Sequence, residues 1–343
     1  MLETSILVIY TGGTIGMVKD DTTGSLKPFN LDKIDQYIPE INRLHYNLEK
    51  ISFDPLTDSS DMSPKDWIKL AEIIEKNYEI YDGFVVLHGS DTMSYTAAAL
   101  SFILKNLNKP VIITGSQLPL GVVRTDGREN FITALEIAAA KDEDDTPIVP
   151  EVCIFFENSL YRGNRTLKYN AENFNAFRSE NYPTLAESGV KIKYFKKYIH
   201  KPNFKKLVLR KKLNSQIAIM KIFPGMQASF VEAMLNANGL RAIVLETFGS
   251  GNAFTNKWFI DLLKNAIDKG LMVFNVTQCI GGSVEMGKYE TSRELKGIGV
   301  IGAGDITTSA AITKLMVIMG EETDKSKIKA RFIKSWVGEI TEQ

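Results

Sequence analysis

Short runs of consecutive apolar residues, each ended by a glycine-containing turn, recur through the first third of the chain. The first run is Ser5–Tyr10, and Thr-Gly-Gly-Thr follows it at positions 11–14. The second and third runs, Phe84–His88 and Val111–Thr114, end in the same way. Apolar runs without polar alternation are typical of strands that are buried on both faces of a sheet.

Helices are predicted between these strands. Residues 93–106 are rich in alanine and leucine and separate the second run from the third. Another helix is predicted from residue 64 to about residue 77, because Ser63 suits the N-cap, proline follows it and Asp66 stands at the third helical position. Alternating strands and helices, with a further strand at Val152–Phe156, favour a parallel sheet with crossover helices.

The second half of the chain repeats this alternation. It predicts strands at 217–222, 242–246 and 272–276 and helices at 229–236, 256–269 and 307–319. The expected fold class is therefore α/β, in two domains. A larger N-terminal domain (1–195) would hold a mainly parallel sheet flanked by helices, and a smaller C-terminal domain (215–343) would hold a short parallel sheet. A length of 343 residues fits about two domains.

A basic segment separates the two predicted domains. Residues 191–212 contain ten lysines or arginines, no acidic residue and four aromatic side chains. Basic stretches with aromatics can bind single-stranded nucleic acid. However, Pro202 and Asn203 interrupt this one, and the 41 basic residues of the whole chain are balanced by 41 acidic ones. We therefore interpret residues 196–214 as a solvated interdomain linker that includes a strand, and we expect no nucleic-acid partner.

Composition excludes several protein classes. With 44% hydrophobic and 24% charged residues, the chain is an ordinary globular protein and not a disordered one. Cys153 and Cys279 are too few for a disulfide framework, and three histidines offer little for zinc, so no metal is expected. No apolar run approaches the roughly 18 residues that span a bilayer, and Met1–Ser5 lacks signal-peptide features. We expect a cytoplasmic protein with no membrane partner.

Hydroxyl side chains gather where the first three predicted strands end. The turns carry six hydroxyls and one carboxylate: Thr11, Thr14, Ser90, Asp91, Thr92, Thr114 and Ser116. Glycine and hydroxyl residues also make ordinary turns. However, ligands of parallel sheets bind beyond the carboxyl ends of the strands, so three such turns together favour a hydroxyl-rich polar site.

Common nucleophile and cofactor motifs do not occur. The chain has no Gly-x-Ser-x-Gly elbow, Walker loop, His-Glu-x-x-His or Cys-x-x-Cys, and its one Gly-x-Gly-x-x-Gly, at 297–302, does not open the first βα unit. Cofactor-free chemistry is favoured. His88 is interpreted as a strand-end histidine bonded to the backbone. A buried lysine could activate a hydroxyl instead, and Lys168 is a candidate, although most lysines are merely exposed.

Six motifs resemble a known family. The segments at 10–16 (Tyr-Thr-Gly-Gly-Thr-Ile-Gly), 88–93 (His-Gly-Ser-Asp-Thr-Met) and 114–117 (Thr-Gly-Ser-Gln) together resemble the bacterial-type L-asparaginases. Those at 58–62 (Asp-Ser-Ser-Asp-Met), 160–166 (Leu-Tyr-Arg-Gly-Asn-Arg-Thr) and 277–279 (Thr-Gln-Cys) point to the cytosolic type I branch. The resemblance runs from about residue 5 to residue 335, and the first two motifs at this separation are highly specific.

The resemblance implies hydrolysis of L-asparagine to L-aspartate and ammonia without a cofactor. Thr14 would be the nucleophile that attacks the side-chain amide and forms a β-acyl-enzyme, which water then resolves. Ser90, Asp91 and Lys168 occupy the positions of the family's second catalytic hydroxyl, its aspartate and its lysine. In that arrangement the lysine serves as the proton acceptor.

The resemblance also implies how the substrate is held. Asp91 would bind the α-ammonium group, and Ser59 with Asp58 beside it would hold the α-carboxylate and α-amino end, since each buried charge needs a partner. Glycines would let the backbone approach closely. Asn252 stands where relatives reach a neighbouring subunit's active site, so a homodimer or a dimer of dimers is expected. The expected substrate-binding residues are Gly13, Asp58, Ser59, Ser60, Gly89, Ser116 and Asn252.

Three features depart from the family pattern. Ser90 stands where threonine is usual, so the methyl that fixes the hydroxyl rotamer is missing. The loop at 20–28 has the composition of a lid but lacks the tyrosine of relatives, which water or Lys27 would have to replace. Glu246 and Leu167 replace an arginine and a polar residue of an allosteric asparagine site. Although Cys279 matches that site, we expect no allostery of that form.

Other functions stay open at this point. A glutaminase-leaning enzyme is one, and an amidotransferase subunit that supplies ammonia for charging tRNA is another. Such a subunit usually carries an added N-terminal domain, whereas the first strand here begins at residue 5. A non-catalytic amino-acid sensor would use the same pocket, and the missing lid tyrosine favours it. Replacement of Thr14 separates an enzyme from a sensor, because a sensor would keep binding aspartate and never turn over.

Overall fold

The computed structural model describes residues 4–19, 26–28, 31–287 and 290–342. The chain divides into two compact units, Met1–Arg210 and Lys211–Gln343. The boundary falls inside the segment predicted as a linker, 196–214. Most of that segment belongs to the first unit, because its strand β14 (Val208–Leu209) pairs with β6 (Leu104–Lys105). No helix in the described part of the chain is both long and apolar enough to cross a membrane.

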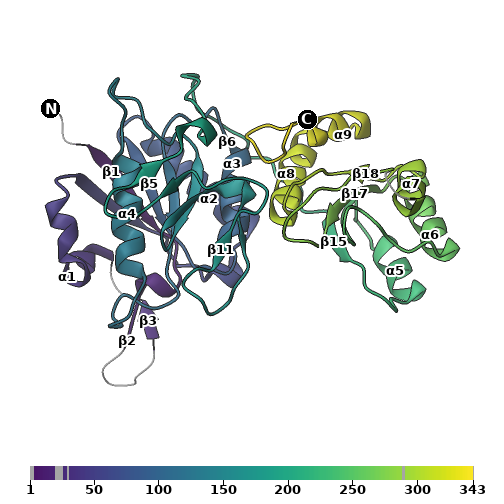
Figure 1. The fold of residues 1–343 in the computed structure, drawn as a ribbon, viewed down its shortest axis with the longest axis horizontal. Coiled ribbons are helices and arrows are strands. Elements are labelled where there is room, and N and C mark those ends of the chain that lie inside the picture. The colour runs from purple at the N-terminus through teal and green to yellow at the C-terminus, as the bar shows by residue number, and fades with distance from the viewer. Residues whose placement is uncertain (1–3, 20–25, 29–30, 288–289, 343) are drawn as a thin grey trace. The chain divides into compact units, whose positions relative to one another are not determined.

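The first unit is built on a sheet that is parallel in its centre and antiparallel toward one edge (Figure 1). Strands β4, β1, β5, β7 and β8 run parallel, whereas β9, β12 and β13 are added antiparallel. In spatial order the strands are β13 (Lys193–Tyr194), β12 (Ala186–Glu187), β9 (Ser159–Arg162), β8 (Val152–Phe156), β7 (Val111–Thr114), β5 (Gly83–Leu87), β1 (Ser5–Tyr10) and β4 (Asn47–Ser52).

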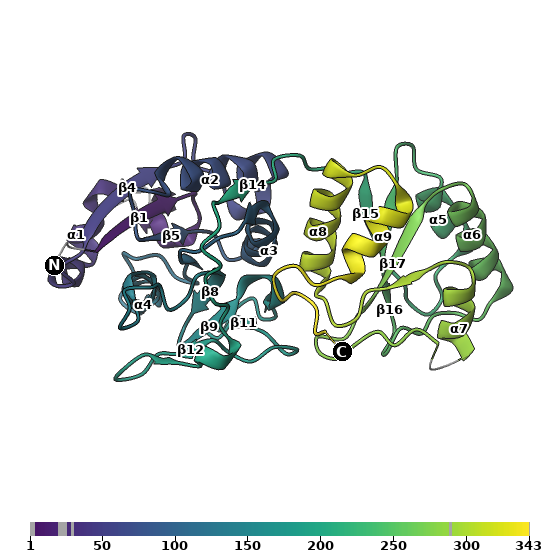
Figure 2. The same ribbon diagram turned by 90° about the horizontal axis from the view of Figure 1, so that it is seen from above.

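Helices cover both faces of this sheet (Figure 2). On one face, α1 (Ile34–Tyr37) and α4 (Gly127–Ala139) share an apolar core with alternate strand residues such as Val8 and Val85. On the other face lie α2 (Pro64–Asn77) and α3 (Met93–Ile103). The start of α2 has the predicted capping box, in which the serine before the helix and the aspartate at its third position bond to each other's backbone.

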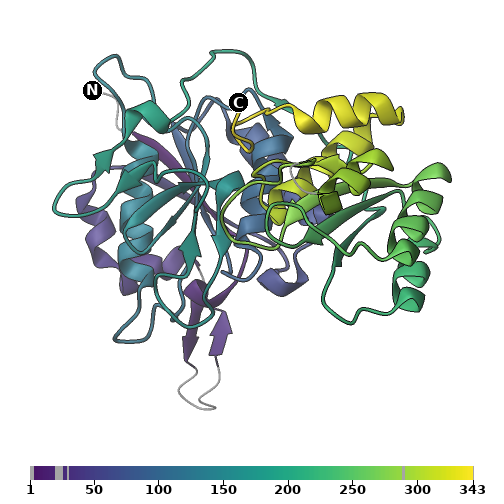
Figure 3. The same cartoon turned by 45° about the vertical axis from the view of Figure 1, so that its right-hand side comes forward.

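Short elements complete the first unit. The turn after β1 contains the 3-10 helix η1 (Thr14–Gly16), and a second pair of strands, β2 (Met17–Lys19) and β3 (Leu26–Pro28), is antiparallel (Figure 3). The predicted lid residues 20–25 lie outside the described residues, as do residues 29–30. The remaining short elements are η2 (Leu31–Lys33), η3 (Pro39–Arg43), η4 (Ser59–Asp61), η5 (Gly163–Arg165), η6 (Lys196–Tyr198), β10 (Leu167–Lys168) and β11 (Phe177–Arg178).

The second unit has its own parallel sheet, in the order β15 (Ile217–Lys221), β16 (Ala242–Thr247), β17 (Met272–Thr277) and β18 (Ile301–Gly302). One face packs an apolar core against α5 (Ala228–Leu235), α6 (Lys257–Asp268) and α7 (Glu290–Gly297). On the other face lie α8 (Thr308–Glu321) and α9 (Lys325–Ile333) (Figure 2). There the rings of Phe274 and Phe332 approach to 4.4 Å between centroids.

The predicted fold class is confirmed in both units. Each strand predicted from an apolar run is present within about two residues, because continuous apolar runs suit strands that helices cover on both faces. One helix is shorter than predicted. It ends at Ile103 and not at residue 106, since Leu104 and Lys105 leave the helix to pair with β14.

Candidate active site

The predicted nucleophile lies in the turn after the central strand β1. Thr11 N and Oγ1 both donate to the carbonyl oxygen that ends β5, at 3.0 and 3.1 Å, so the turn starts fixed to its neighbour. Gly12 and Gly13 then adopt φ angles of 133° and 93°, which other residues rarely do. Thr14 follows and is half-buried. No described residue hydrogen-bonds to its hydroxyl, which leaves that hydroxyl able to contact a substrate.

Two glycines bring three turns into direct contact. A Cβ atom on Gly13 would lie 2.4 Å from Gly89 Cα, and a Cβ atom on Gly89 would lie 2.4 Å from Ser59 Oγ. Only glycine permits such approaches. Because Thr14 follows Gly13 and Ser90 follows Gly89, the turns that carry both hydroxyls lie against each other and against Ser59.

The turn at 58–61 is ordered by its own side chains. Asp58 caps η4 and accepts hydrogen bonds from Ser60 N (2.9 Å) and Ser60 Oγ (2.7 Å). These two bonds hold the pKa of the Asp58 carboxyl below its ordinary value. Ser59 is buried, and its carbonyl oxygen accepts from Thr92 Oγ1 at 2.5 Å. An ionised carboxylate and a serine hydroxyl are thereby fixed beside the turn of Ser90.

A lysine joins the second hydroxyl to a carboxylate. Lys168 Nζ donates to Ser90 Oγ and to Asp91 Oδ1, both at 2.8 Å. The Lys168 side chain is only 16% exposed, whereas that of Asp91 is 66% exposed. The ammonium is thus paired at the edge of the site, where it can exchange a proton with a hydroxyl on one side and keep a counter-charge on the other.

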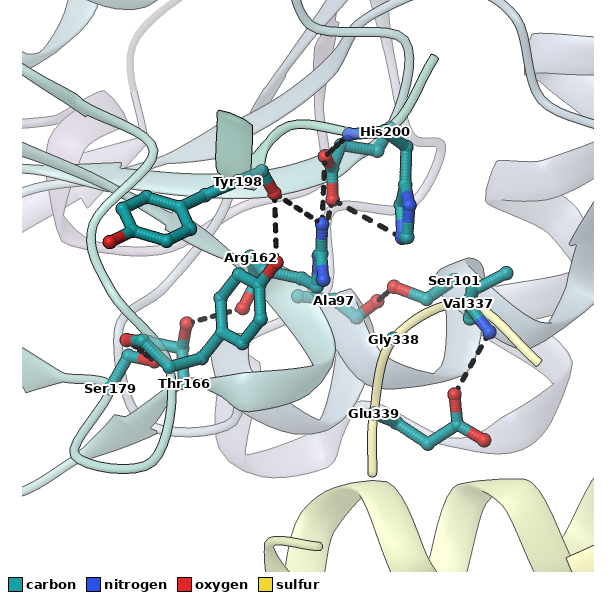
Figure 4. A network of polar contacts seen from close by, with 12 residues as sticks. Ala97, Ser101, Arg162, Thr166, Ser179, Tyr198, His200, Val337, Gly338 and Glu339 are labelled. Carbon is teal, nitrogen blue, oxygen red and sulfur yellow. Dashed lines mark hydrogen bonds and ion pairs between the residues drawn. The ribbon is translucent and has the colours of Figure 1, made fainter. Parts of the chain in front are cut away.

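The segment that delivers Lys168 is anchored by a buried ion pair (Figure 4). Arg162, at the end of β9, donates to Glu151 Oε2 at 2.7 Å and to Tyr198 O at 2.8 Å, and both charged side chains are buried. The next residue, Gly163, packs so closely on α3 that a Cβ atom there would lie 2.9 Å from Ala97 Cβ. These contacts set the position of η5 and of the strand β10 that follows it.

His88 is a fully buried structural residue, as interpreted from its position at a strand end. Its Nδ1 lies 2.6 Å from Gly89 O, and its Nε2 lies 2.9 Å from Thr96 Oγ1, which also accepts from Trp67 Nε1 at 3.1 Å. Burial lowers the pKa of His88 to about 4, so the ring is neutral at physiological pH. The neutral ring therefore holds the carbonyl of the residue that precedes Ser90.

Tyr10 is the tyrosine that precedes the nucleophile turn in the chain. Its hydroxyl lies 3.4 Å from Gly13 O, and a Cβ atom on Gly16 would lie 2.1 Å from the same hydroxyl. Burial raises the pKa of Tyr10 to about 12, which makes it a poor proton acceptor at neutral pH. Tyr10 therefore fills the turn and does not take the place of a lid tyrosine.

Gln117 is a site residue to which sequence reasoning gave no role. It follows β7 in the motif at 114–117, and its Oε1 accepts from Ser90 Oγ at 3.2 Å. Its Nε2 donates to Ala171 O and Asn173 O, each at 3.1 Å. The position after a strand end was the available signal, but the partners lie more than fifty residues away and no motif shows them.

Two predicted substrate-binding residues stand apart from the others. Ser116 is buried, and its hydroxyl donates to Leu118 O at 2.6 Å. Asn252 belongs to the second unit, where its backbone pairs with Phe248 in a tight turn. The predicted residues that the first unit gathers along one sheet edge are Gly13, Thr14, Asp58, Ser59, Ser60, Gly89, Ser90, Asp91 and Lys168.

The corresponding edge of the second unit is occupied by local hydrogen bonds. Glu246 accepts from Thr308 Oγ1 at 2.6 Å and lies 3.7 Å from Lys221 Nζ. Gln278 Nε2 donates to Ile222 O and to the carbonyl of Glu246, at 2.7 and 2.8 Å. Within the described residues, no group of three or more His, Cys, Asp or Glu side chains is placed to hold a metal ion.

Two family models match the chain. The model described as "Asparaginase, N-terminal" matches residues 5–200, and the one described as "Glutaminase/Asparaginase C-terminal domain" matches residues 216–332. Among curated proteins, L-asparaginase 1 of Escherichia coli (strain K12) is 42% identical over 342 residues, which covers 99% of both chains.

Solved structures resemble the chain over the same span. L-asparaginase I from Vibrio cholerae matches with a TM-score of 0.89 and 39% identity, covering 99% of this chain and 100% of that one. The thermostable L-asparaginase from Thermococcus kodakarensis matches with a TM-score of 0.90 and 29% identity, again covering 99% and 100%. The similarity therefore includes both units and the sheet edge that carries the candidate site.

Proposed function

The chain belongs to the asparaginase family along both of its units, and we propose that it hydrolyses L-asparagine to L-aspartate and ammonia. The observation that carries this proposal is the contact of Lys168 with Ser90 and Asp91, next to the turn of Thr14. A hydroxyl nucleophile, a second hydroxyl, a lysine and a carboxylate meet at one sheet edge, which is the set that amide hydrolysis without histidine needs.

In the first half of the reaction, Thr14 Oγ1 attacks the carbon of the side-chain amide. The hydroxyl proton passes by way of Ser90 to a neutral Lys168, and Asp91 holds the ammonium that results. The same proton then goes to the departing nitrogen, so the C–N bond breaks and ammonia leaves. What stays behind is a β-acyl ester on Thr14.

In the second half, water attacks the ester carbon and gives a proton to Lys168. The C–O bond to the enzyme then breaks, L-aspartate leaves, and Thr14 recovers its proton. Backbone N–H groups at the glycine-rich turns are the donors that we assign to the negative charge on the carbonyl oxygen in both steps.

The substrate is a zwitterion, and the fixed charges at the site support its binding. Asp91 is the partner that we assign to the α-ammonium group. Ser59 would donate to the α-carboxylate, and the ionised Asp58 beside it would give the α-ammonium group a second negative neighbour. We assign Gly13, Ser60 and Gly89 to the shape of the same edge, whereas Ser116, whose hydroxyl is bonded to Leu118 O, would act only through the turn that follows β7. Asn252 is expected to act on the site of a neighbouring copy, so we propose a homodimer or a dimer of dimers, located in the cytoplasm.

The test is ammonia release from the purified protein with L-asparagine and with L-glutamine, at increasing concentrations, beside Thr14→Ala. We expect release from asparagine that saturates and that is lost in Thr14→Ala, because the acyl-enzyme cannot form. Release from neither amide, with L-aspartate still raising the thermal unfolding midpoint, would overturn the proposal in favour of an amino-acid sensor.

A further inference from the structure

When Lys168 is charged, the acceptor that the described residues offer to the hydroxyl proton of Ser90 is Gln117. An ammonium nitrogen donates and cannot accept, so the 2.8 Å contact from Lys168 Nζ uses a lone pair of Ser90 Oγ. The proton of Ser90 must then point elsewhere. Gln117 Oε1 accepts it at 3.2 Å.

The orientation of the Gln117 amide is fixed by its surroundings. Its Nε2 lies 3.1 Å from the carbonyl oxygens of Ala171 and Asn173, which can only accept hydrogen bonds. A flipped amide would place an oxygen against both carbonyls and would offer Ser90 a donor in place of the acceptor for its proton. The side-chain oxygen therefore faces Ser90, and the contact is directional.

Gln117 is itself held in place at its backbone. Asp126 accepts from Gln117 N at 3.0 and 3.1 Å and from Leu118 N at 3.1 Å. Through Nε2, Gln117 also donates to the loop of residues 170–175, which begins two residues after Lys168 in the chain. The amide of Gln117 thus bonds both to the hydroxyl of Ser90 and to the loop that follows Lys168.

A serine needs such a partner more than a threonine does. Threonine has a methyl group on Cβ that restricts χ1, whereas the serine hydroxyl rotates among three positions. At Ser90, one of these positions is selected by a donor, Lys168, and an acceptor, Gln117, together.

We propose that Gln117 is a positioning residue that holds the hydroxyl of Ser90 in the rotamer that faces Lys168 and receives its proton while the lysine is charged. When Lys168 becomes neutral, the proton can turn toward it without movement of any heavy atom. The inference rests on the proposed amide hydrolysis and adds to it a residue that determines the geometry of the proton path.

The test is a double-mutant cycle of Gln117→Leu and Ser90→Thr, with kcat and KM for L-asparagine measured for all four proteins. With serine at 90, we expect Gln117→Leu to lower kcat about tenfold with little change in KM, as loss of one oriented hydrogen bond would. With threonine at 90, the same change should cost less than about threefold, because the added methyl restores the rotamer.

Gln278→Leu is the matched control. Gln278 also follows a parallel strand and also donates from Nε2 to two backbone carbonyls, but it lies in the second unit, and both of these carbonyls belong to that unit. Both glutamine variants should lower the thermal unfolding midpoint to a similar degree, and only Gln117→Leu should lower kcat. Should Gln117→Leu fail to fold, Gln117→Met keeps the length of the side chain and takes its place in the cycle.

Three outcomes would overturn the inference. The first is an equal loss of kcat with serine and with threonine at 90, the second is a change in KM alone, and the third is an equal loss in Gln278→Leu. In each case the wild-type protein still releases ammonia, so the proposed function stands. If the wild-type protein releases none, the proposed function fails first, and that result is distinguishable.

Discussion

The two parallel sheets of this chain end in edges of similar chemistry and different use. Each edge has a glycine turn after its strands, a lysine close to a carboxylate, and a glutamine that donates to two backbone carbonyls. In the first unit the lysine and glutamine, Lys168 and Gln117, also contact a serine hydroxyl. In the second unit, the contacts described for Lys221 and Gln278 go to the Glu246 carboxylate and to backbone carbonyls.

The difference teaches that residue types alone do not make a site. At the first edge, neighbouring turns touch through Gly13 and Gly89, so that side chains from separate strands meet. At the second edge, Gly225 has nearly the same φ as Gly13, 91° against 93°, but a Cβ atom there would meet nothing within 4 Å. The turns that Gly13 and Gly89 bring together carry the hydroxyls of Thr14 and Ser90, and the turn of Gly225 has no such contact.

The lysines give the largest expected contrast. Lys168→Met removes the proton acceptor, and we expect kcat to fall by about 10³-fold, within the range for loss of general base catalysis. Lys221→Met removes a lysine that is 64% exposed and 3.7 Å from its carboxylate, so activity should stay within about twofold. Ammonia release from both variants checks the contrast. Equal losses would mean that the Ser90–Lys168 contact is not part of the reaction.

The glycines in the turns give the next largest expected contrast between the two edges. Gly13→Ala places a methyl 2.4 Å from Gly89 Cα, which must push the two turns apart. We expect about 10²-fold lower kcat, as for a displacement of about 1 Å at a catalytic group. Gly225→Ala also puts an alanine at a positive φ, but it has open space around the added methyl. It should lower stability by about 1 kcal/mol and leave kcat unchanged.

These two variants are compared by kcat at saturating asparagine and by denaturant unfolding. If Gly225→Ala lowers kcat as strongly as Gly13→Ala, backbone strain and not the contact between turns explains the effect. Thermal unfolding of each variant in the presence of L-aspartate would then show whether the site of Gly13→Ala still binds product.

The pH dependence of stability also differs between the two units, because all three histidines lie in the first unit and one of them, His88, is fully buried. Burial lowers its pKa from 6.5 to about 4 in the folded protein. Between these values the unfolded chain binds a proton that the folded chain does not, so stability falls as pH decreases. The expected loss is about 2 kcal/mol at pH 5.

Urea unfolding of the wild-type protein and of His88→Asn is measured at pH 7.5 and at pH 5. The contribution of His88 is the difference between the two proteins in the free energy of unfolding lost between these pH values, since the titratable groups that they share contribute equally to both. The asparagine amide can still donate to Gly89 O, so the variant should fold. Equal pH dependence in the two proteins would contradict a neutral, buried ring at this position.

Much of the fold could be predicted because its signals are local. Central strands such as β1 and β5 are buried on both faces and so appear as apolar runs, and the capping box before α2 lies within four residues. The edge strand β4 was missed, because its residues alternate between exposed and half-buried and form no such run. The pairing of β6 with β14 involves two residues each and has no sequence signal, so the attachment of residues 208–209 to the first unit could not be predicted.

The residues of the candidate site also differ in whether the local sequence indicates them. Thr14, Ser90 and Asp91 stand in motifs at strand ends, where position indicates a polar site and the family resemblance implies their roles. Lys168 was a weak candidate by pattern, since only its distance to Ser90 distinguishes it from other lysines. Gln117 was missed because its partners come from a loop that is distant in sequence, and such contacts appear only when the chain is folded.

Glu246 gives the smallest expected effect and tests whether the second edge has any regulatory use. Glu246→Gln keeps an oxygen that can accept from Thr308 Oγ1, and it loses only the ion pair with the exposed Lys221, a type of pair worth less than about 1 kcal/mol. We expect the unfolding midpoint to change little and kcat to stay within about twofold. The rate against asparagine concentration should be hyperbolic before and after the change, because the carboxylate is already satisfied by neighbours within its own unit. A sigmoidal curve in the wild-type protein that becomes hyperbolic in Glu246→Gln would contradict this, and it would make the second edge a regulatory site that acts through Glu246.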